Sequence, residues 1–323
     1  MGSFITLGTI QTALELGVIY SLVALALFLS FSMLNVCDLS TDSCFTLGCA
    51  VGSMVAIAGH PILAIFAAMG AGILSGYLTA LLQTKLGVES ILAGIIVNTG
   101  LYTINIFIMG KSILNLNTTT TVFTLARDLL KGSPLEDWSR LIVAVLFVGV
   151  IAVLLAFFLH TRLGLSIRAT GDNEDMVKAS SINPSLTIIV GLCVANAMTA
   201  LSGCLLGEYQ KSCDINMGTG MVTIALASLI IGETLMGRGG IPFRIVGVLF
   251  GSCLYRVIVA IAMRFNLPAS ALKLVSALIV AVAIASPTLR QMVGFQKIKW
   301  RRKSQYGQQK AAANQGKDGE GPC

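Results

Sequence analysis

The segment TRLGLSIRATGDNEDMVKASSINP, residues 161–184, is a dense polar stretch in an otherwise apolar chain. It holds two arginines, one lysine, two aspartates and one glutamate, and almost pure hydrocarbon flanks it on both sides. Charged groups are costly inside a bilayer. We therefore expect the segment to lie outside the hydrocarbon layer. It separates two long apolar parts of the chain, one on each side.

Within this segment, the residue order predicts a short amphipathic helix over residues 172–183. Asp172 or Asn173 can cap its start, and the two acidic residues that follow suit the helix dipole. Asn183 before proline ends the helix and begins the next apolar run. Its apolar positions are Met176, Val177, Ala179 and Ile182. The alternative, a solvated turn held by its own charges, has little need of these apolar residues, so we expect a helix that docks on a partner.

The composition of the whole chain indicates a membrane protein. Of its 323 residues, 55% are hydrophobic and only 11% are charged, whereas a soluble domain carries about 25% charged residues. There is too little polar material to coat a globule of this size in water, so lipid must solvate most of the surface. The N-terminus lacks a basic region and a cleavage signal, and we interpret it as the first span.

We expect an all-α polytopic membrane protein with about nine transmembrane helices, within a range of roughly eight to ten. The expected spans are 9–33, 44–59, 61–83, 90–110, 140–160, 185–207, 219–236, 243–263 and 269–288. The expected organisation is a first transmembrane repeat (1–110), an extracytoplasmic loop (111–139), a linking span (140–160), a cytoplasmic loop (161–184), a second transmembrane repeat (185–288) and a basic, disordered cytoplasmic tail (289–323).

Charge placement predicts the orientation of these spans. The residues after Pro287 include eight Lys and Arg against two acidic residues, and positive charge flanking spans marks the cytoplasmic side. Such a tail suits an anionic leaflet better than nucleic acid, because it has few interleaved aromatic residues. Counting back from a cytoplasmic C-terminus, the links at 84–89, 161–184 and 237–242 lie inside. The loops at 111–139 and 208–218 and the N-terminus lie outside.

An internal repeat is suggested by two polar interruptions with similar flanks. Residues 35–48, NVCDLSTDSCFTLG, align with residues 211–224, KSCDINMGTGMVTI. The G-x-x-x-G pair of Gly72 and Gly76 then aligns with that of Gly247 and Gly251. Spans one to four would match spans six to nine in inverted orientation, as in many transport proteins. The alternative for each glycine pair is a close helix approach alone.

Several polar residues lie within or between the expected spans. Glu15 either faces a protein interior or sits near the outer interface. The break over residues 38–43 is either a cytoplasmic turn or a broken helix beside a pathway, because unwound backbone at membrane depth must be covered by protein or water. For each asparagine taken alone, an interhelical hydrogen bond is the usual role. The pathway candidates are Glu15, Asp38, Ser40, Thr41, Asp42, Ser43, Asn98, Asn196 and Asp214.

Catalytic, metal and cofactor sites are not expected. The eight cysteines include no C-x-x-C pair and lie mostly in apolar runs, and the two histidines are far apart in sequence. Met109-Gly110-Lys111-Ser112 resembles the end of a phosphate-binding loop, but Asn105 occupies the position of its first glycine. The chain is therefore not expected to be an enzyme, and any pumping must use energy from elsewhere.

The charged segment resembles a known family. The pattern L-G-x-x-I-R-A-T-G-D-N-x-x-M-V-K-A-S-S-I-N is similar to the coupling region of permeases in the branched-chain amino acid and ribose class of ATP-binding-cassette (ABC) importers. The stretches GVIYSLVALALFLSFSMLN and DLSTDSCFTLGCAVGS resemble the tryptophan/tyrosine-type subgroup. The resemblance covers about residues 10–290, and Cys44 departs from it by standing where small residues are usual.

This resemblance implies a prokaryotic inner-membrane permease that pairs with a second copy. Two cytoplasmic ATPase subunits would dock on it and hydrolyse ATP, and an extracytoplasmic substrate-binding lipoprotein would deliver a small polar solute, an amino acid of aromatic type. By position, the pathway break falls on Asp38–Ser43. The residues expected to couple to the ATPase are Arg168, Gly171, Asp172, Asn173, Glu174, Asp175, Met176, Val177, Lys178, Ile182 and Asn183. No partner other than protein and membrane lipid is expected, and nucleic acid is not.

Three alternatives remain open at this point. An ion-gradient-driven secondary transporter would use Glu15, Asp38 and Asp214 as ion ligands. An ABC permease for a sugar or nucleoside would share the same architecture. A membrane-embedded enzyme would need a convergent catalytic set, which the sequence does not display.

Overall fold

The computed structural model describes residues 7–263 except 130, 133–135 and 238, together with the single residues 274, 277, 278, 281 and 285. Apart from those five positions, the expected span 269–288 and the expected tail 289–323 lie outside the described residues.

The described chain is almost entirely helical. Its long helices are α1 (Leu7–Leu27, continued by the π-helix η1, Phe28–Met33), α3 (Pro61–Thr84), α4 (Ser90–Met109), α6 (Ser139–His160), α9 (Pro184–Gln210) and α11 (Ile241–Met263). Two shorter apolar helices are α2 (Thr41–Ile57) and α10 (Met221–Met236). The remaining elements are β1 (Ile113–Asn115), α5 (Val122–Leu129), the 3-10 turn η2 (Glu136–Trp138), α7 (Arg162–Asp172), α8 (Glu174–Ala179) and β2 (Ser212–Asp214).

The helices follow the expected spans closely. Within the described residues, six helices are long and apolar enough to cross a membrane. Eight of the nine expected spans coincide with a helix, and the two that coincide with α2 and α10 are too short to cross by themselves. The all-helical membrane class is confirmed, whereas the count of nine spans stays a prediction.

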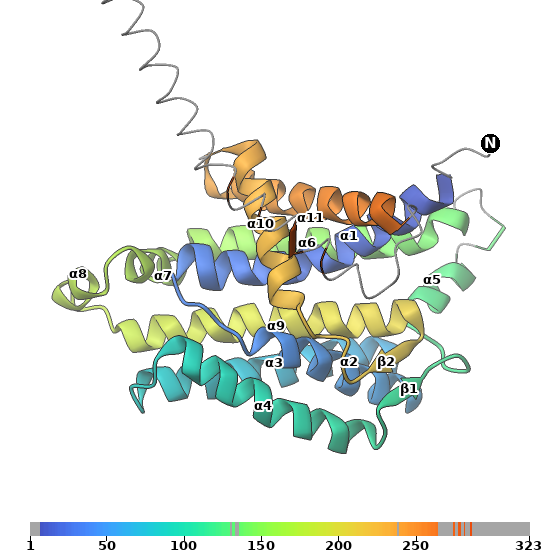
Figure 1. Cartoon of the computed structure of the whole chain (residues 1–323), viewed down its shortest axis with the longest axis horizontal. Coiled ribbons are helices and arrows are strands. Elements are labelled where there is room, and N and C mark those ends of the chain that lie inside the picture. Colours follow the sequence, from blue (N-terminus) through green and yellow to red (C-terminus); the bar gives the residue numbers. More distant parts are fainter. Residues whose placement is uncertain are drawn as a thin grey trace, which may run out of the picture.

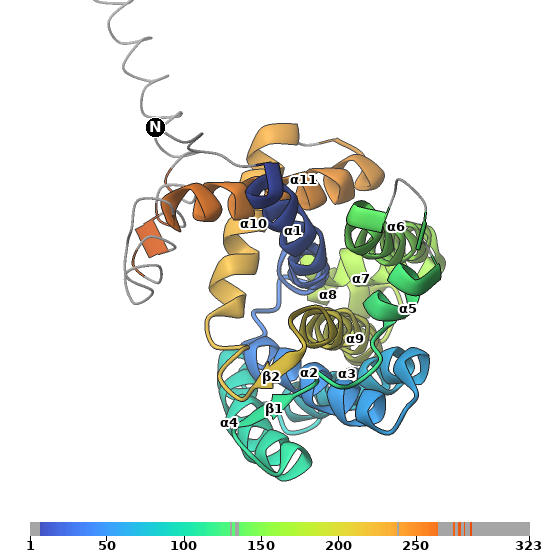
Figure 2. The same ribbon diagram turned by 90° about the vertical axis from the view of Figure 1, so that its right-hand side faces the viewer.

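Helix α9 lies at the centre of the molecule. It packs against α2 and α3 on one side and against α1 on the other, and α11 packs against both α1 and α10 (Figures 1 and 2). The largest buried cluster is built from side chains of α1 and η1 such as Leu22, Leu25 and Phe28, together with side chains of α6, α9, α10 and α11. This arrangement leaves α3, α4 and α6 with many exposed apolar side chains, as expected for a surface that meets lipid.

The glycine pairs noted in the sequence lie at helix crossings. Gly48 and Gly52 of α2 face Ala200 and Cys204 of α9, where an added Cβ would collide with those residues. The Gly72/Gly76 pair packs on α9 in the same way, and Gly247/Gly251 packs on α10. Small residues that let helices approach closely are therefore confirmed, while the inverted repeat itself stays a prediction.

Polar segments gather at the two ends of the bundle. Strands β1 and β2 pair antiparallel, with Leu114 opposite Cys213, so the loops 111–139 and 208–218 lie together at one end beside α5. Helices α7 and α8 lie at the opposite end (Figure 1). The charge pattern assigned these two sets of loops to opposite sides of the membrane, and the fold separates them in that way.

Candidate functional site

The chain between η1 and α2 is a polar break. The π-helix ends at Met33, and Asn35 adopts a left-handed conformation with φ 56°, which asparagine tolerates better than most residues. The Asp38 side chain is 1% exposed and accepts hydrogen bonds from the Ser40 backbone N–H at 2.8 Å and from Asn196 Nδ2 at 2.9 Å. A buried carboxylate needs such donors to offset its lost hydration.

This break is buried inside the helix bundle, level with the middle of two long helices. Asn196 is in the middle of the long helix α9, and Asn98 is in the middle of α4. The Ser43 backbone N–H donates to Asn98 Oδ1 at 3.0 Å, and Ser43 Oγ donates to the Asn98 carbonyl at 2.8 Å. The structure thus shows that protein surrounds the break, and a broken helix beside a pathway stays a prediction.

Asp42 connects two helices that both begin at this depth. It lies in the first turn of α2, and its carboxylate accepts the backbone N–H groups of Gly220 and Val222, each at 2.9 Å, at the start of α10. Gly218 packs so closely on the Asp42 carbonyl that a Cβ there would collide with it. Because helix N-termini carry partial positive charge, one carboxylate stabilises both.

Seven of the nine predicted pathway residues belong to this polar cluster, which we call the break cluster. Its members are Asp38, Ser40, Thr41, Asp42, Ser43, Asn98 and Asn196. Three further residues join it: Thr79 donates to Ser40 Oγ at 3.2 Å, Asn105 donates to the Ser43 carbonyl at 3.0 Å, and Thr46 accepts from Gly218. Cys44 is accommodated there, since its thiol donates to the Asn196 carbonyl at 3.4 Å.

The other two predicted pathway residues lie elsewhere. Glu15 is 4% exposed and accepts a hydrogen bond from Tyr209 Oη at 2.7 Å, near the end of the bundle that carries α5. Asp214 lies at the end of β2, where its carboxylate accepts the backbone N–H of the exposed Asn216. Neither residue contacts the break cluster through a hydrogen bond.

Arg256 is a charged residue inside an expected span that was not among the predicted pathway residues. Arg256 lies within α11 with its guanidinium 3.5 Å from the centroid of the Tyr20 ring, and Tyr20 stacks on Phe45 with centroids 6.1 Å apart. In the part of the chain that the structure describes, no ion pair includes Arg256, and its buried Nε has no hydrogen-bond partner.

The contact with Tyr20 does not fully offset the free-energy cost of a charged Arg256 within a membrane helix. A charge at the middle of a membrane helix costs about 2.5–3.5 kcal/mol even on insertion scales. A desolvated cation–π contact returns about 2 kcal/mol. The Tyr20 ring therefore offsets only part of the cost of placing the half-buried Arg256 in this apolar helix. A signal was present in the sequence, because Arg256 interrupts the apolar run 243–263.

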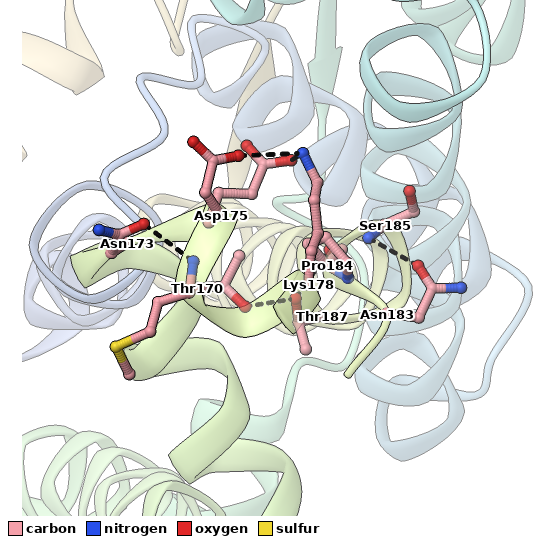
Figure 3. A network of polar contacts seen from close by, with 10 residues as sticks. Thr170, Asn173, Asp175, Lys178, Asn183, Pro184, Ser185 and Thr187 are labelled. Carbon is pink, nitrogen blue, oxygen red and sulfur yellow. Dashed lines mark hydrogen bonds and ion pairs between the residues drawn. The ribbon is translucent and has the colours of Figure 1, made fainter. Parts of the chain in front are cut away.

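At the end of the bundle opposite α5, helices α7 and α8 form the charged segment 161–184 (Figures 1 and 3). Asn173 caps α8, as predicted, by accepting the Met176 N–H at 3.0 Å. Lys178 pairs with Glu174 at 2.9 Å and lies 3.7 Å from Asp175. The hydrogen bond to Glu174 raises the pKa of Lys178. Asn183 caps α9 through the Ser185 N–H at 3.0 Å.

The predicted single helix over 172–183 is wrong in its bounds. Two helices occupy the segment, and α7 begins ten residues earlier, at Arg162, where Thr161 accepts the Gly164 N–H. The second helix ends at Ala179, and Ser181 has a positive φ of 60°. The apolar residues divide between roles, because Val177 is buried whereas the Met176 side chain is 61% exposed.

Helix α7 is fixed to the bundle at three points. Ile167 is fully buried, and Thr170 Oγ1 lies 2.8 Å from Thr187 Oγ1 of α9 (Figure 3). Gly171 lies against the Met33 carbonyl, where a Cβ would collide. Met33 is the last residue of η1, so the contact joins α7 directly to the chain that leads into the break cluster.

A second polar cluster joins η1, α10 and α11. Arg244 forms an ion pair with Glu233, and Ser32 donates to the same Glu233 oxygen at 2.9 Å. The guanidinium of Arg244 also lies 5.0 Å from the centroid of the Phe28 ring. Among the described residues, no group of three or more His, Cys, Asp or Glu side chains could hold a metal ion.

Comparison with known proteins gives consistent similarities. The family described as "Branched-chain amino acid transport system / permease component" matches residues 9–286. A tyrosine transport system permease protein of Clostridioides difficile is 31% identical over 272 residues, which cover 84% of this chain and 88% of that protein. A ribose import permease protein of Escherichia coli is 28% identical over 222 residues, covering 67% of this chain and 65% of the relative. No solved structure gives a significant match.

Proposed function

Because the chain belongs to the family of branched-chain amino acid transport system permease components, we propose that it is the transmembrane subunit of an ABC importer that moves an amino acid into the cytoplasm. It is a multi-pass protein of the inner membrane, with transport rather than enzymatic relatives. ATP hydrolysis takes place on a separate subunit.

The observation that carries this proposal is the attachment of α7 and α8. Met176 extends an apolar side chain into solvent beside the charged residues of α8, while Val177 on the same short helix is buried. Leu163 and Leu165 of α7 are exposed as well, and several exposed apolar side chains in one charged segment suit a protein partner. The partner is the ATPase, and the expected coupling residues, Arg168–Asn183, are its docking surface.

The contact between Gly171 and Met33 supplies the route by which motion reaches the pathway. A displacement of α7 must move the η1 end, because the packing leaves no space at this contact. The chain then runs through residues 34–37 to Asp38, where the break cluster contacts α4 and α9. We propose that the break cluster lies beside the solute pathway and rearranges when the ATPases close.

The remaining assignments follow from this orientation. The α7–α8 end and the basic tail face the cytoplasm, and the end with β1, β2 and α5 receives a substrate-binding lipoprotein. A second copy of the chain completes the permease. Of the two kinds of relative, the tyrosine permease covers more of the chain at higher identity than the ribose permease, which favours an amino acid, of aromatic type, over a sugar.

Reconstitution with a partner ATPase and a substrate-binding protein tests the proposal. We expect ATP-dependent uptake of L-tyrosine into proteoliposomes that withstands an ionophore. Uptake that needs no ATPase and collapses with the ionophore would establish a secondary transporter, and uptake of ribose alone would establish a sugar permease.

Charge reversal then tests the docking surface. Arg168→Glu and Glu174→Lys are expected to lower ligand-stimulated ATP hydrolysis about tenfold. The double variant Glu174→Lys with Lys178→Glu is the matched control, because it keeps the ion pair within α8 while it inverts the outward charge pattern. Full stimulation in all three variants would exclude this surface as the ATPase contact.

A further inference from the structure

A cavity of about 270 Å³ lies between α1 and α11. Thr9 and Met263 line it at the end of the bundle that carries α5, and Leu16 and Arg256 line its deeper part. Thr9 and Thr12 each add a hydroxyl, and the lining side chains other than these two and Arg256 are apolar. Arg256 is the one charged side chain among the lining residues.

Two other cavities between described residues are lined by different kinds of side chain. A larger one, of about 390 Å³, lies between α3, α6 and α9 and is lined by apolar residues and a cysteine, so it selects no polar ligand. A third, near Glu15, contains both acidic and basic groups: its Arg127 pairs with Glu136, its Tyr209 bonds to Glu15, and its Arg140 lies over the Tyr209 ring. Of these three cavities between described residues, the one at Arg256 combines an apolar wall with a cation that no described carboxylate neutralises.

We propose that this cavity is a binding site for an organic carboxylate, with the carboxylate on Arg256 and an apolar side chain along the wall formed by Leu16, Val259 and Ala260. The site deepens the proposed function and rests on it, because the ligand is then the amino acid in transit. Arginine suits the task, since its planar guanidinium matches the geometry of a carboxylate and stays charged when buried.

The aromatic residues below the site connect it to the break cluster. The Arg256 guanidinium lies on the Tyr20 ring, and Tyr20 stacks on Phe45, which is in the second turn of α2, one helical turn after Asp42. A carboxylate that draws Arg256 toward the cavity weakens its contact with Tyr20. Occupancy of the cavity is thereby transmitted to the N-terminal end of α2.

The test is protection of an introduced thiol in the full-length protein in phosphatidylcholine nanodiscs. Ala260→Cys places a thiol in the cavity wall, and its modification by a methanethiosulfonate reagent is measured above the background of the protein without the added cysteine. L-Tyrosine at about twice its Kd should slow modification about threefold. Tyramine, which lacks the carboxylate, and ribose should leave the rate unchanged.

Substitutions of the arginine sharpen the result. Arg256→Lys should keep part of the protection, and Arg256→Gln should lose it. Protection by tyramine equal to that by L-tyrosine, protection by ribose, or full protection in Arg256→Gln would overturn the proposal. The tyramine comparison uses the native arginine, so it stands even if a variant at position 256 fails to fold. Protection by phosphatidylglycerol without any amino acid would assign the cavity to lipid and overturn it too.

The uptake assay separates this proposal from the proposed function. ATP-driven uptake without carboxylate-dependent protection would leave the transport role intact and reject the site. Carboxylate-dependent protection without ATP-driven uptake would support the site and reject the importer.

Discussion

Asp42 is a single carboxylate that serves two helices, and its removal should be costly. In Asp42→Ala, the N–H groups of Gly220 and Val222 lose their acceptor, and the α10 cap is lost. We expect a loss of about 2 kcal/mol in stability, measured as a lower midpoint of thermal unfolding in detergent. Asp214→Ala is the control, because the Asp214 carboxylate accepts the backbone N–H of the exposed Asn216 in a turn, and its loss should cost about 0.5 kcal/mol or less. Equal costs would contradict the role of Asp42.

Gly171 permits a close approach that no other residue allows. Gly171→Ala should push α7 away from the Met33 carbonyl, at a cost on the order of 1–3 kcal/mol, and should reduce stimulation of ATP hydrolysis by ligand. Gly149→Ala in α6 is matched to it, since a Cβ there meets nothing within 4 Å. That variant should be neutral or up to about 1 kcal/mol more stable. Normal stimulation in Gly171→Ala would show that α7 does not transmit motion through this contact.

Residues differed in how far the sequence could predict them. The polar break at 38–43 was predictable because a cluster of polar residues interrupts an apolar run. The bond from Asp42 to Gly220 and Val222 was not, because it joins positions about 180 residues apart and only the fold brings them together. Arg256 was visible as a charge in an apolar run, but its contacts with Tyr20 and the cavity depend on how α1 and α11 pack.

Helix α8 carries two adjacent apolar residues with different surroundings: Met176 is exposed and Val177 is buried. Met176→Asp should leave thermal stability nearly unchanged, because the side chain is 61% exposed, but should weaken binding of the ATPase about tenfold or more. Val177→Asp places a charge at a position that is 1% exposed and should destabilise the α7–α8 segment itself. Binding by surface plasmon resonance and thermal unfolding distinguish the two. Unchanged ATPase binding in Met176→Asp would remove Met176 from the interface.

At the scale of elements, periodicity and length predicted the long helices well. They failed at α7, whose Arg162, Ser166 and Arg168 made it look like loop, although Ile167 and Thr170 on its other face are buried. Short helices at polar boundaries are held by tertiary contacts more than by their own propensity. The same reason explains why α8 ends at Ala179, four residues before its predicted end.

The whole molecule carries its polar segments at two opposite ends, and this makes the orientation testable. Met176→Cys at the α8 tip and Leu129→Cys at the end of α5 are both well exposed, at 61% and 84% for the native side chains. A membrane-impermeant maleimide should label position 129 in intact spheroplasts and position 176 only in inside-out vesicles. Each variant serves as the control for the other. Labelling of both from one side would overturn the two-ended architecture, and reversed labelling would overturn the cytoplasmic assignment of α7 and α8.

Helices of the two predicted repeats pack on each other in a crosswise way. The third span, α3, packs on the first span of the other repeat, α9, and the third span of that repeat, α11, packs on α1. The sequence suggested such a relation through two similar interruptions, and the second of these, residues 211–224, contains the Gly218–Val222 stretch that contacts Asp42. Sequence similarity could suggest equivalence between the halves. It could not predict that the two interruptions touch, because contact depends on how the halves are assembled.

In the proposed importer, the shared carboxylate of Asp42 would act as a latch. Helices α2 and α10 begin beside each other, and the Gly220 and Val222 N–H groups would lose their acceptor if the two helices separated. A motion that slides them apart must break both hydrogen bonds and leave a buried carboxylate without these donors, so a partial displacement would reverse. We therefore expect a threshold: an incomplete displacement of α7 would move no solute, and only a complete one would carry it through.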